Sequence, residues 1–160
     1  MELESLFGLP AHPLVVHAAV ALLPLAAIAT IITAAVPRSR RHYAPVALGL
    51  ALVATLAVGL AQGSGEALEE RVDETELVEE HTEQGETVLP WAIALTVVAA
   101  GVTVAPMVTR RYPKLSPTTV TAVLVIAALI TGIGALWTVI DVGHSGAKAT
   151  WDDLPAGAED

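Results

Sequence analysis

The chain has 160 residues, an apolar fraction of 54% and a formal net charge of −9 at pH 7. The length suits one compact domain, and the apolar fraction is too high for a water-soluble domain of this size, so the composition indicates a membrane protein. The sequence has no cysteine, which excludes disulfides, thiolate metal sites, iron–sulfur centres and covalently attached haem.

Four apolar segments are long enough to cross about 30 Å of hydrocarbon, which takes roughly 20 helical residues. We place these spans at about 13–36, 43–62, 88–108 and 117–140. The first lacks a basic start and a small-residue cleavage site, so we interpret it as a retained span and not as a signal peptide. The sequence therefore predicts an all-α integral membrane four-helix bundle, a single domain over residues 1–160.

The first span opens with HPLVVHAAVALLP, which places His12 and His17 at its start. Along a helix axis the two residues are roughly 7 Å apart, and their side chains differ by about 140° in direction. In an uninterrupted helix the two rings therefore lie on different faces. Polar groups at such depth usually have partners inside the bundle and often mark function.

Basic residues gather in the two connections that join spans one and two and spans three and four. They are Arg38, Arg40, Arg41, Arg110, Arg111 and Lys114. The positive-inside rule assigns both connections to the cytoplasm, and both termini to the outside. We therefore expect a multi-pass protein of the cytoplasmic (inner) membrane, N-out and C-out.

Between spans two and three, residues 63–87 are acidic and rich in helix-forming residues. Leu77 and Val78 form an apolar side that His81 shares. We expect an extra acidic amphipathic helix lying across the outer ends of the bundle. Its carboxylates are most simply a solvated charged face.

Four of the five histidines are expected to meet at the outer end of the bundle, although they come from three distant parts of the chain. They are His12, His17, His81 and His144. The fifth, His42, belongs to a basic connection on the inner side. The convergence predicts a shared ligand site.

Imidazoles without thiolates would hold haem of the b type through two axial histidines, an arrangement that suits electron transfer. The first axial pair we expect is His17 and His144, with His12 and His81 as a second pair or as supporting ligands. Copper or zinc bound by the same four histidines is an alternative. A further alternative is a structural subunit that assembles a larger membrane complex.

Three polar residues near the end of the last span are candidates to support such a site. Asp141 lies one turn before His144 and could fix a histidine tautomer, or it could face water at the helix end. Ser145 and Lys148 are placed to donate hydrogen bonds to haem propionates at the outer rim.

The motif HPLVVHAAVALLP resembles the entry motif of a bacterial membrane-protein family described as domain of unknown function 2231. GLAQGSG after span two, His81 before span three and GHSGA after span four resemble later landmarks of that family. The resemblance implies a four-span bundle, sometimes fused to or neighbouring Rieske-type iron–sulfur proteins. It also implies b-type haem bound through the four outer histidines. Ala18 stands where the family often has phenylalanine, which weakens the aromatic side of a haem pocket.

Other function classes lack the residues they need. Ser64 and Ser145 lie in glycine-rich stretches with no base nearby in the sequence, so a hydrolase or transferase is not predicted. There is no phosphate-binding loop and no basic patch with stacking aromatics, so we expect no nucleic-acid partner. The expected partners are the lipid bilayer and a redox protein, Rieske-type or quinone-linked, at the outer face. We interpret the chain as a redox carrier or subunit more than a stand-alone enzyme.

Overall fold

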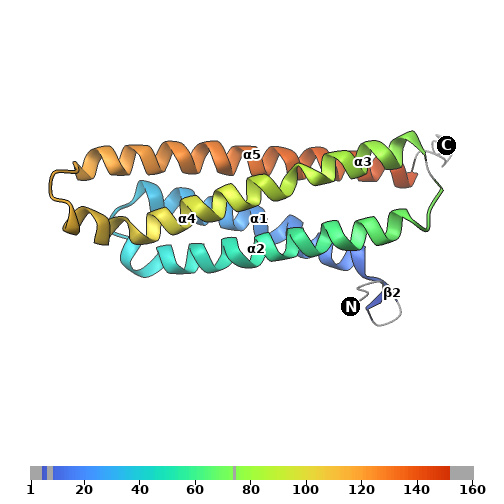
Figure 1. Ribbon diagram of the computed structural model, residues 1–160, viewed down its shortest axis with the longest axis horizontal. Coiled ribbons are helices and arrows are strands. Elements are labelled where there is room, and N and C mark those ends of the chain that lie inside the picture. Colours follow the sequence, from blue (N-terminus) through green and yellow to red (C-terminus); the bar gives the residue numbers. More distant parts are fainter. Residues whose placement is uncertain (1–4, 7–8, 74, 152–160) are drawn as a thin grey trace, which may run out of the picture.

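Long α-helices dominate the computed structural model, which describes residues 5–6, 9–73 and 75–151. The helices are α1 (Ala11–Ala35), α2 (Arg40–Glu69), α3 (Glu76–Glu86), α4 (Val88–Arg111) and α5 (Pro117–Trp151). Ahead of them, the two-residue strands β1 (Ser5–Leu6) and β2 (Leu9–Pro10) pair antiparallel. The helices lie side by side along one long axis (Figure 1).

Four stretches of the described chain are long and apolar enough to cross a membrane. They are His12–Ala35, Arg40–Glu69, Glu76–Arg111 and Pro117–Trp151. The four-helix membrane bundle predicted from the sequence is thereby confirmed. Two helices extend past the predicted membrane spans. Helix α2 continues for about two turns after residue 62, and α5 for about three turns after residue 140.

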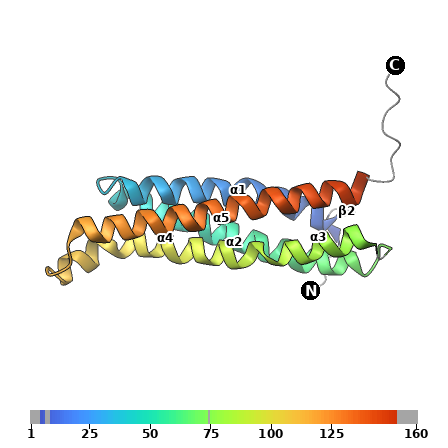
Figure 2. The same ribbon diagram turned by 90° about the horizontal axis from the view of Figure 1, so that it is seen from above.

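Short connections make α1–α2 and α4–α5 antiparallel hairpins. Because α1 also packs on α5 and α2 packs on α4, the four long helices close a ring (Figures 1 and 2). Both connections lie at one end of the bundle, which we call the basic end after Arg38, Arg41, Arg110, Arg111 and Lys114. The opposite end, formed by the start of α1, the end of α2, α3 and the end of α5, we call the acidic end.

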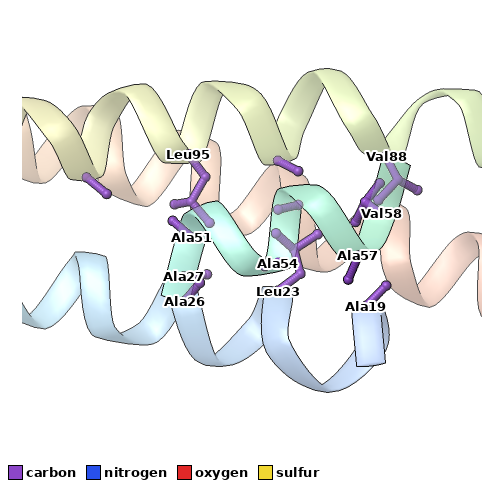
Figure 3. Close-up of a cluster of buried hydrophobic side chains, with 13 residues drawn as sticks. Ala19, Leu23, Ala26, Ala27, Ala51, Ala54, Ala57, Val58, Val88 and Leu95 are labelled. Atoms are coloured by element: carbon purple, nitrogen blue, oxygen red, sulfur yellow. The ribbon is translucent and has the colours of Figure 1, made fainter. Parts of the chain in front are cut away.

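The core between the two hairpins consists largely of alanine. Ala26, Ala27, Ala51, Ala54 and Ala92 are completely buried. In Figure 3, Leu95 of α4 points toward Ala51 and Leu23 of α1 points toward Ala54, so the few large core side chains fit against small ones. Inside lipid, close van der Waals contact between backbones drives helix association, and small residues allow it.

The acidic segment differs from the expectation of one helix across the bundle ends. Residues 63–69 continue α2, and only Glu76–Glu86 form the separate helix α3. Helix α3 runs in line with α4 and packs alongside α5 (Figure 1). The Thr75 side chain caps it by accepting a hydrogen bond from the Val78 N–H at 3.3 Å, which satisfies a free donor of the first turn. Because α3 packs on α5, its apolar side, which includes the half-buried His81, faces the bundle.

Arg40, at the start of α2, is buried at the basic end and forms hydrogen bonds to α1 and α5. Its Nε donates to the Thr33 carbonyl at 3.2 Å, and its Nη2 donates to the Ala34 carbonyl at 2.6 Å. Nη2 also donates to Thr121 Oγ1 of α5 at 3.1 Å. Thr33 and Ala34 carry carbonyls of the last turn of α1, which have no partner within the helix and attract a cation.

We expect Arg40→Ala to destabilise the bundle by about 3 kcal/mol, because it leaves buried carbonyls without a charged donor. The measurement is thermal unfolding of the detergent-purified protein. Arg41→Ala is the matched control, since Arg41 is the exposed neighbour in the same turn, and its melting temperature should stay at the wild-type value. Equal melting temperatures for the two variants would contradict the capping role of Arg40.

Candidate functional site

His12, in the first turn of α1, packs against the end of α2. Its Nδ1 lies 3.0 Å from the Ala61 carbonyl oxygen and 3.4 Å from Ser64 Oγ. A carbonyl can only accept, so Nδ1 carries a proton, and in the uncharged form of the ring the lone pair is at Nε2. A β-carbon added at Gly65 would lie 3.1 Å from His12 Cε1, so this glycine makes room for the ring.

His81, on α3, packs in a similar way against the end of α5. Its Nδ1 lies 3.1 Å from Ser145 Oγ, which itself donates to the Val142 carbonyl at 3.1 Å. Ser145 therefore accepts the His81 Nδ1–H, and Nε2 is again the lone-pair nitrogen. A β-carbon added at Gly146 would lie 2.8 Å from His81 Cε1. Each hairpin thus holds one imidazole against a Ser-Gly pair.

The pKa of His81 depends on its burial and on the nearby His12. Helix α3 carries five glutamates and precedes the apolar part of its stretch, so His81 lies outside the hydrocarbon layer. Burial lowers the pKa of His81 below its ordinary value, and the electrostatic interaction with His12 lowers it further, while a hydrogen bond to the Val142 backbone raises it. His81 is therefore neutral at pH 7, the form that binds metals. His12 of α1 is therefore close enough to His81 of α3 to affect its charge, and both lie at the acidic end of the bundle.

This shift predicts a pH dependence of stability. Because the pKa of His81 is lower in the folded than in the unfolded chain, protonation favours unfolding. The stability is complete above about pH 6.5 and is lost as the pH falls from there through the lowered pKa. Melting temperatures measured between pH 5 and 8 should show this decline, and His81→Gln should make it shallower. An unchanged slope in the variant would show that other groups cause the decline.

The expected first axial pair, His17 and His144, does not lie in this interior. The His17 ring is exposed, and its Nδ1 donates to the Pro13 carbonyl of its own helix. His144 is exposed on α5. Helical phase explains both positions, because each residue adds about 100° of rotation: His17 points away from the face of His12, and His144 points away from that of Ser145.

The other predicted site residues divide in the same way. Asp141 and Lys148 are exposed on α5, so neither supports the half-buried rings. Ser145 is buried and does take part, as the hydrogen-bond partner of His81 and not as a donor to a propionate. Among the supporting residues, only Ser145 joins the site.

Sequence reasoning missed three parts of the site. They are Ser64 and the glycines Gly65 and Gly146, all of which lie in helices. The repeated Ser-Gly pair, in GSG after span two and HSG after span four, was the signal that could have found them. Gln84 Oε1, one turn after His81, is buried and has no hydrogen-bond partner within the part of the chain that the structure describes, so it is a further acceptor near His81.

The donor set distinguishes between candidate ligands. Within residues 5–6, 9–73 and 75–151, no group of three or more His, Cys, Asp or Glu side chains could hold a metal ion. Protein-bound zinc takes three or four protein ligands, and copper sites likewise use several. A haem iron needs only two axial ligands from the protein. The two half-buried imidazoles are thus fewer than the protein ligands of a zinc site and equal in number to the axial ligands of a haem iron.

Two glycines of α5 offer a matched test of the His81 position. Gly146→Ala should displace the His81 ring, because the new methyl group meets Cε1 at 2.8 Å, whereas nothing lies within 4 Å of a β-carbon at Gly143. The histidine ring signals in NMR spectra should shift for Gly146→Ala and stay in place for Gly143→Ala. Identical spectra would mean that the ring adjusts without moving from its hydrogen bond.

Comparison with known proteins agrees with this architecture. A family model described as "Predicted membrane protein (DUF2231)" matches residues 8–154, which include all five helices. No curated protein and no solved structure matches the chain. The matched range contains both Ser-Gly pairs and both half-buried histidines.

Proposed function

The chain belongs to the DUF2231 family of predicted membrane proteins, and we propose that it is an electron-transfer protein that binds b-type haem at its acidic end. His12 and His81 are the axial ligands in this proposal. One observation carries it: α1 and α3 each supply one half-buried imidazole whose Nδ1 is hydrogen-bonded and whose Nε2 has no hydrogen-bond partner among the described residues. The bound haem would supply an iron that takes up and releases one electron.

The chain's own residues support such a ligand in three ways. The Ala61 carbonyl and Ser145 Oγ hold the tautomers in which Nε2 is unprotonated, as partners of ligand histidines usually do. Gly65 and Gly146 leave space for the rings. Because the ligands come from α1 and α3, binding would also link the α1–α2 hairpin to α3 and its neighbour α5.

The location and partners follow from the charge distribution. With the basic end in the cytoplasm, the acidic end lies outside the inner membrane, together with both chain termini. The exposed glutamates of α3 then surround the site on the side that meets water. A redox protein, Rieske-type or quinone-linked, would exchange electrons there.

The test is an absorption spectrum of detergent-purified protein from cells supplied with a haem precursor, recorded as isolated and after dithionite. We expect a Soret band and sharp α and β bands on reduction, the signature of two axial histidines. Elemental analysis of the same sample measures iron, copper and zinc. A featureless spectrum from folded, monodisperse protein would overturn the proposal. Stoichiometric copper or zinc would then indicate the metal-binding alternative, and no metal would indicate a structural subunit.

A further inference from the structure

Arg40, at the basic end, is a buried cation without an anionic partner in the described chain. Its side chain is 6% exposed, and its three hydrogen bonds go to two backbone carbonyls and to the Thr121 hydroxyl. Residues 5–65 and 87–140 contain no Asp or Glu, so neither hairpin connection supplies a carboxylate. Because a buried charge is costly unless it is paired, Arg40 favours an anion from outside the chain.

The helix ends beside the guanidinium do not neutralise it. The last turn of α1, with the Thr33 and Ala34 carbonyls, carries a partial negative charge, and the start of α5, near Thr121, carries a partial positive charge. Each is equivalent to about half an elementary charge, so the two effects oppose each other. The charge of Arg40 is therefore left largely uncompensated.

One nitrogen of Arg40 is available to a ligand. Nε and Nη2 donate the hydrogen bonds of this side chain, which leaves Nη1 without a partner in the described chain. Among the described residues, the unpartnered side-chain atoms that are shut off from solvent are Thr30 Oγ1 and Gln84 Oε1, so a ligand can reach Nη1. The bonds of Nε and Nη2 fix the planar guanidinium, and with it the direction of the Nη1 donors.

The level of Arg40 in the membrane indicates the chemistry of this ligand. Tyr43 and Tyr112, at the same end of the bundle, are 64% and 59% exposed. Exposed tyrosines near the ends of membrane spans lie at the level of the lipid headgroups. Arg40 precedes Tyr43 by three residues, about 4.5 Å along the helix axis on the side of the water. It therefore lies where the phosphates of the lipids are.

We propose that Arg40 Nη1 binds a phosphate oxygen of an anionic phospholipid at the basic end. Guanidinium groups bind phosphate through short, charge-assisted hydrogen bonds, and basic pockets between membrane helices are typical sites for such headgroups. Exposed Ile32 and Val123, close in the chain to the hydrogen-bond partners Thr33 and Thr121, offer apolar surface to the acyl chains. The net negative charge is favoured by five exposed basic residues at this end: Arg38, Arg41, Arg110, Arg111 and Lys114.

The first experiment titrates three ligands into the full wild-type chain in an uncharged detergent, followed by calorimetry. The ligands are dihexanoylphosphatidylglycerol, dihexanoylphosphatidylcholine and inorganic phosphate. We expect phosphatidylglycerol to bind roughly tenfold more tightly than phosphatidylcholine, whose choline cation offsets the charge of its phosphate. Inorganic phosphate should bind more weakly than phosphatidylglycerol, because it lacks acyl chains.

The second experiment compares Arg40→Gln with Arg41→Gln, which removes the same charge from the exposed neighbour in the same turn. It is run in about 1 M sodium chloride, where a Debye length of about 3 Å screens exposed charges. The dissociation constant of phosphatidylglycerol should rise about tenfold or more in Arg40→Gln and stay close to the wild-type value in Arg41→Gln. The fitted number of sites reports the folded fraction, so a loss of folded protein does not imitate weaker binding.

Three outcomes overturn the proposal. Equal affinities of the wild type for the two lipids would remove the preference for an anionic headgroup, and inorganic phosphate binding as tightly as phosphatidylglycerol would assign the site to a free anion. Equal losses in Arg40→Gln and Arg41→Gln would show diffuse attraction without a site at Arg40. The wild-type titrations involve no variant, so they test the proposal even where Arg40→Gln does not fold. The site lies at the end opposite His12 and His81, and none of these measurements depends on haem.

Discussion

Replacing His12 or His81 by alanine is expected to abolish the low-spin haem spectrum. In the proposed haem site each substitution would remove one of two axial ligands, and the other three histidines, all among the described residues, are exposed. The affinity for haem should fall by more than the roughly 10- to 100-fold that the loss of a ligand's hydrogen-bond partner costs. The measurement is haem titration of the purified variants, followed by the Soret band and by electron paramagnetic resonance of the ferric form.

His17→Ala and His144→Ala are the matched controls, since both remove an exposed histidine at the acidic end. Both variants should retain the full low-spin spectrum. The opposite pattern, with the spectrum lost in these two and kept in His12→Ala and His81→Ala, would restore the axial pair expected from the sequence alone. It would also show that the half-buried pair has only a packing role.

Gly134→Ala is expected to cause the largest loss of stability of any single glycine substitution in the bundle. A β-carbon at this position would lie 2.4 Å from Trp91 Cε3 and Cζ3, and 2.7 Å from Cδ2. The Trp91 ring is rigid and lies between α4 and α5, so either the ring or a helix has to move. Overpacking of this kind costs about 3 kcal/mol or more.

The measurement is equilibrium unfolding in detergent, with Gly59→Ala as the control. Nothing lies within 4 Å of a β-carbon at Gly59, and alanine is the better helix former, so that variant should be as stable as the wild type or more stable. If Gly134→Ala and Gly59→Ala have the same free energy of unfolding, the close packing of Trp91 on α5 does not exist in the protein.

Much of the fold could be predicted because hydropathy and charge are properties of short segments. The apolar runs predicted the four spans, and the basic stretches Arg38–Arg41 and Arg110–Lys114 predicted the two hairpin connections. Helices α2 and α5 extend past the predicted spans for a specific reason. The hydropathy of a segment predicts which part of it crosses the hydrocarbon layer. It does not predict where the helix ends, because α2 and α5 continue by packing on neighbouring helices.

The gathering of histidines at one end could be predicted as well, but the roles of the individual rings could not. Which side of α1 faces α2 depends on contacts such as those of Ala26 and Ala27, far from His12 in the helix. A rotation of α1 by one residue, about 100°, would exchange His12 for another ring position.

By itself, the sequence determined that this chain crosses a membrane four times, with basic connections at one end and four histidines near the other. Only the tertiary structure decided that His12 and His81 are half-buried against neighbouring helices while His17 and His144 are exposed. The physical reason is that composition sets the depth of a residue in the bilayer, whereas the packing of helix on helix sets its direction around the axis.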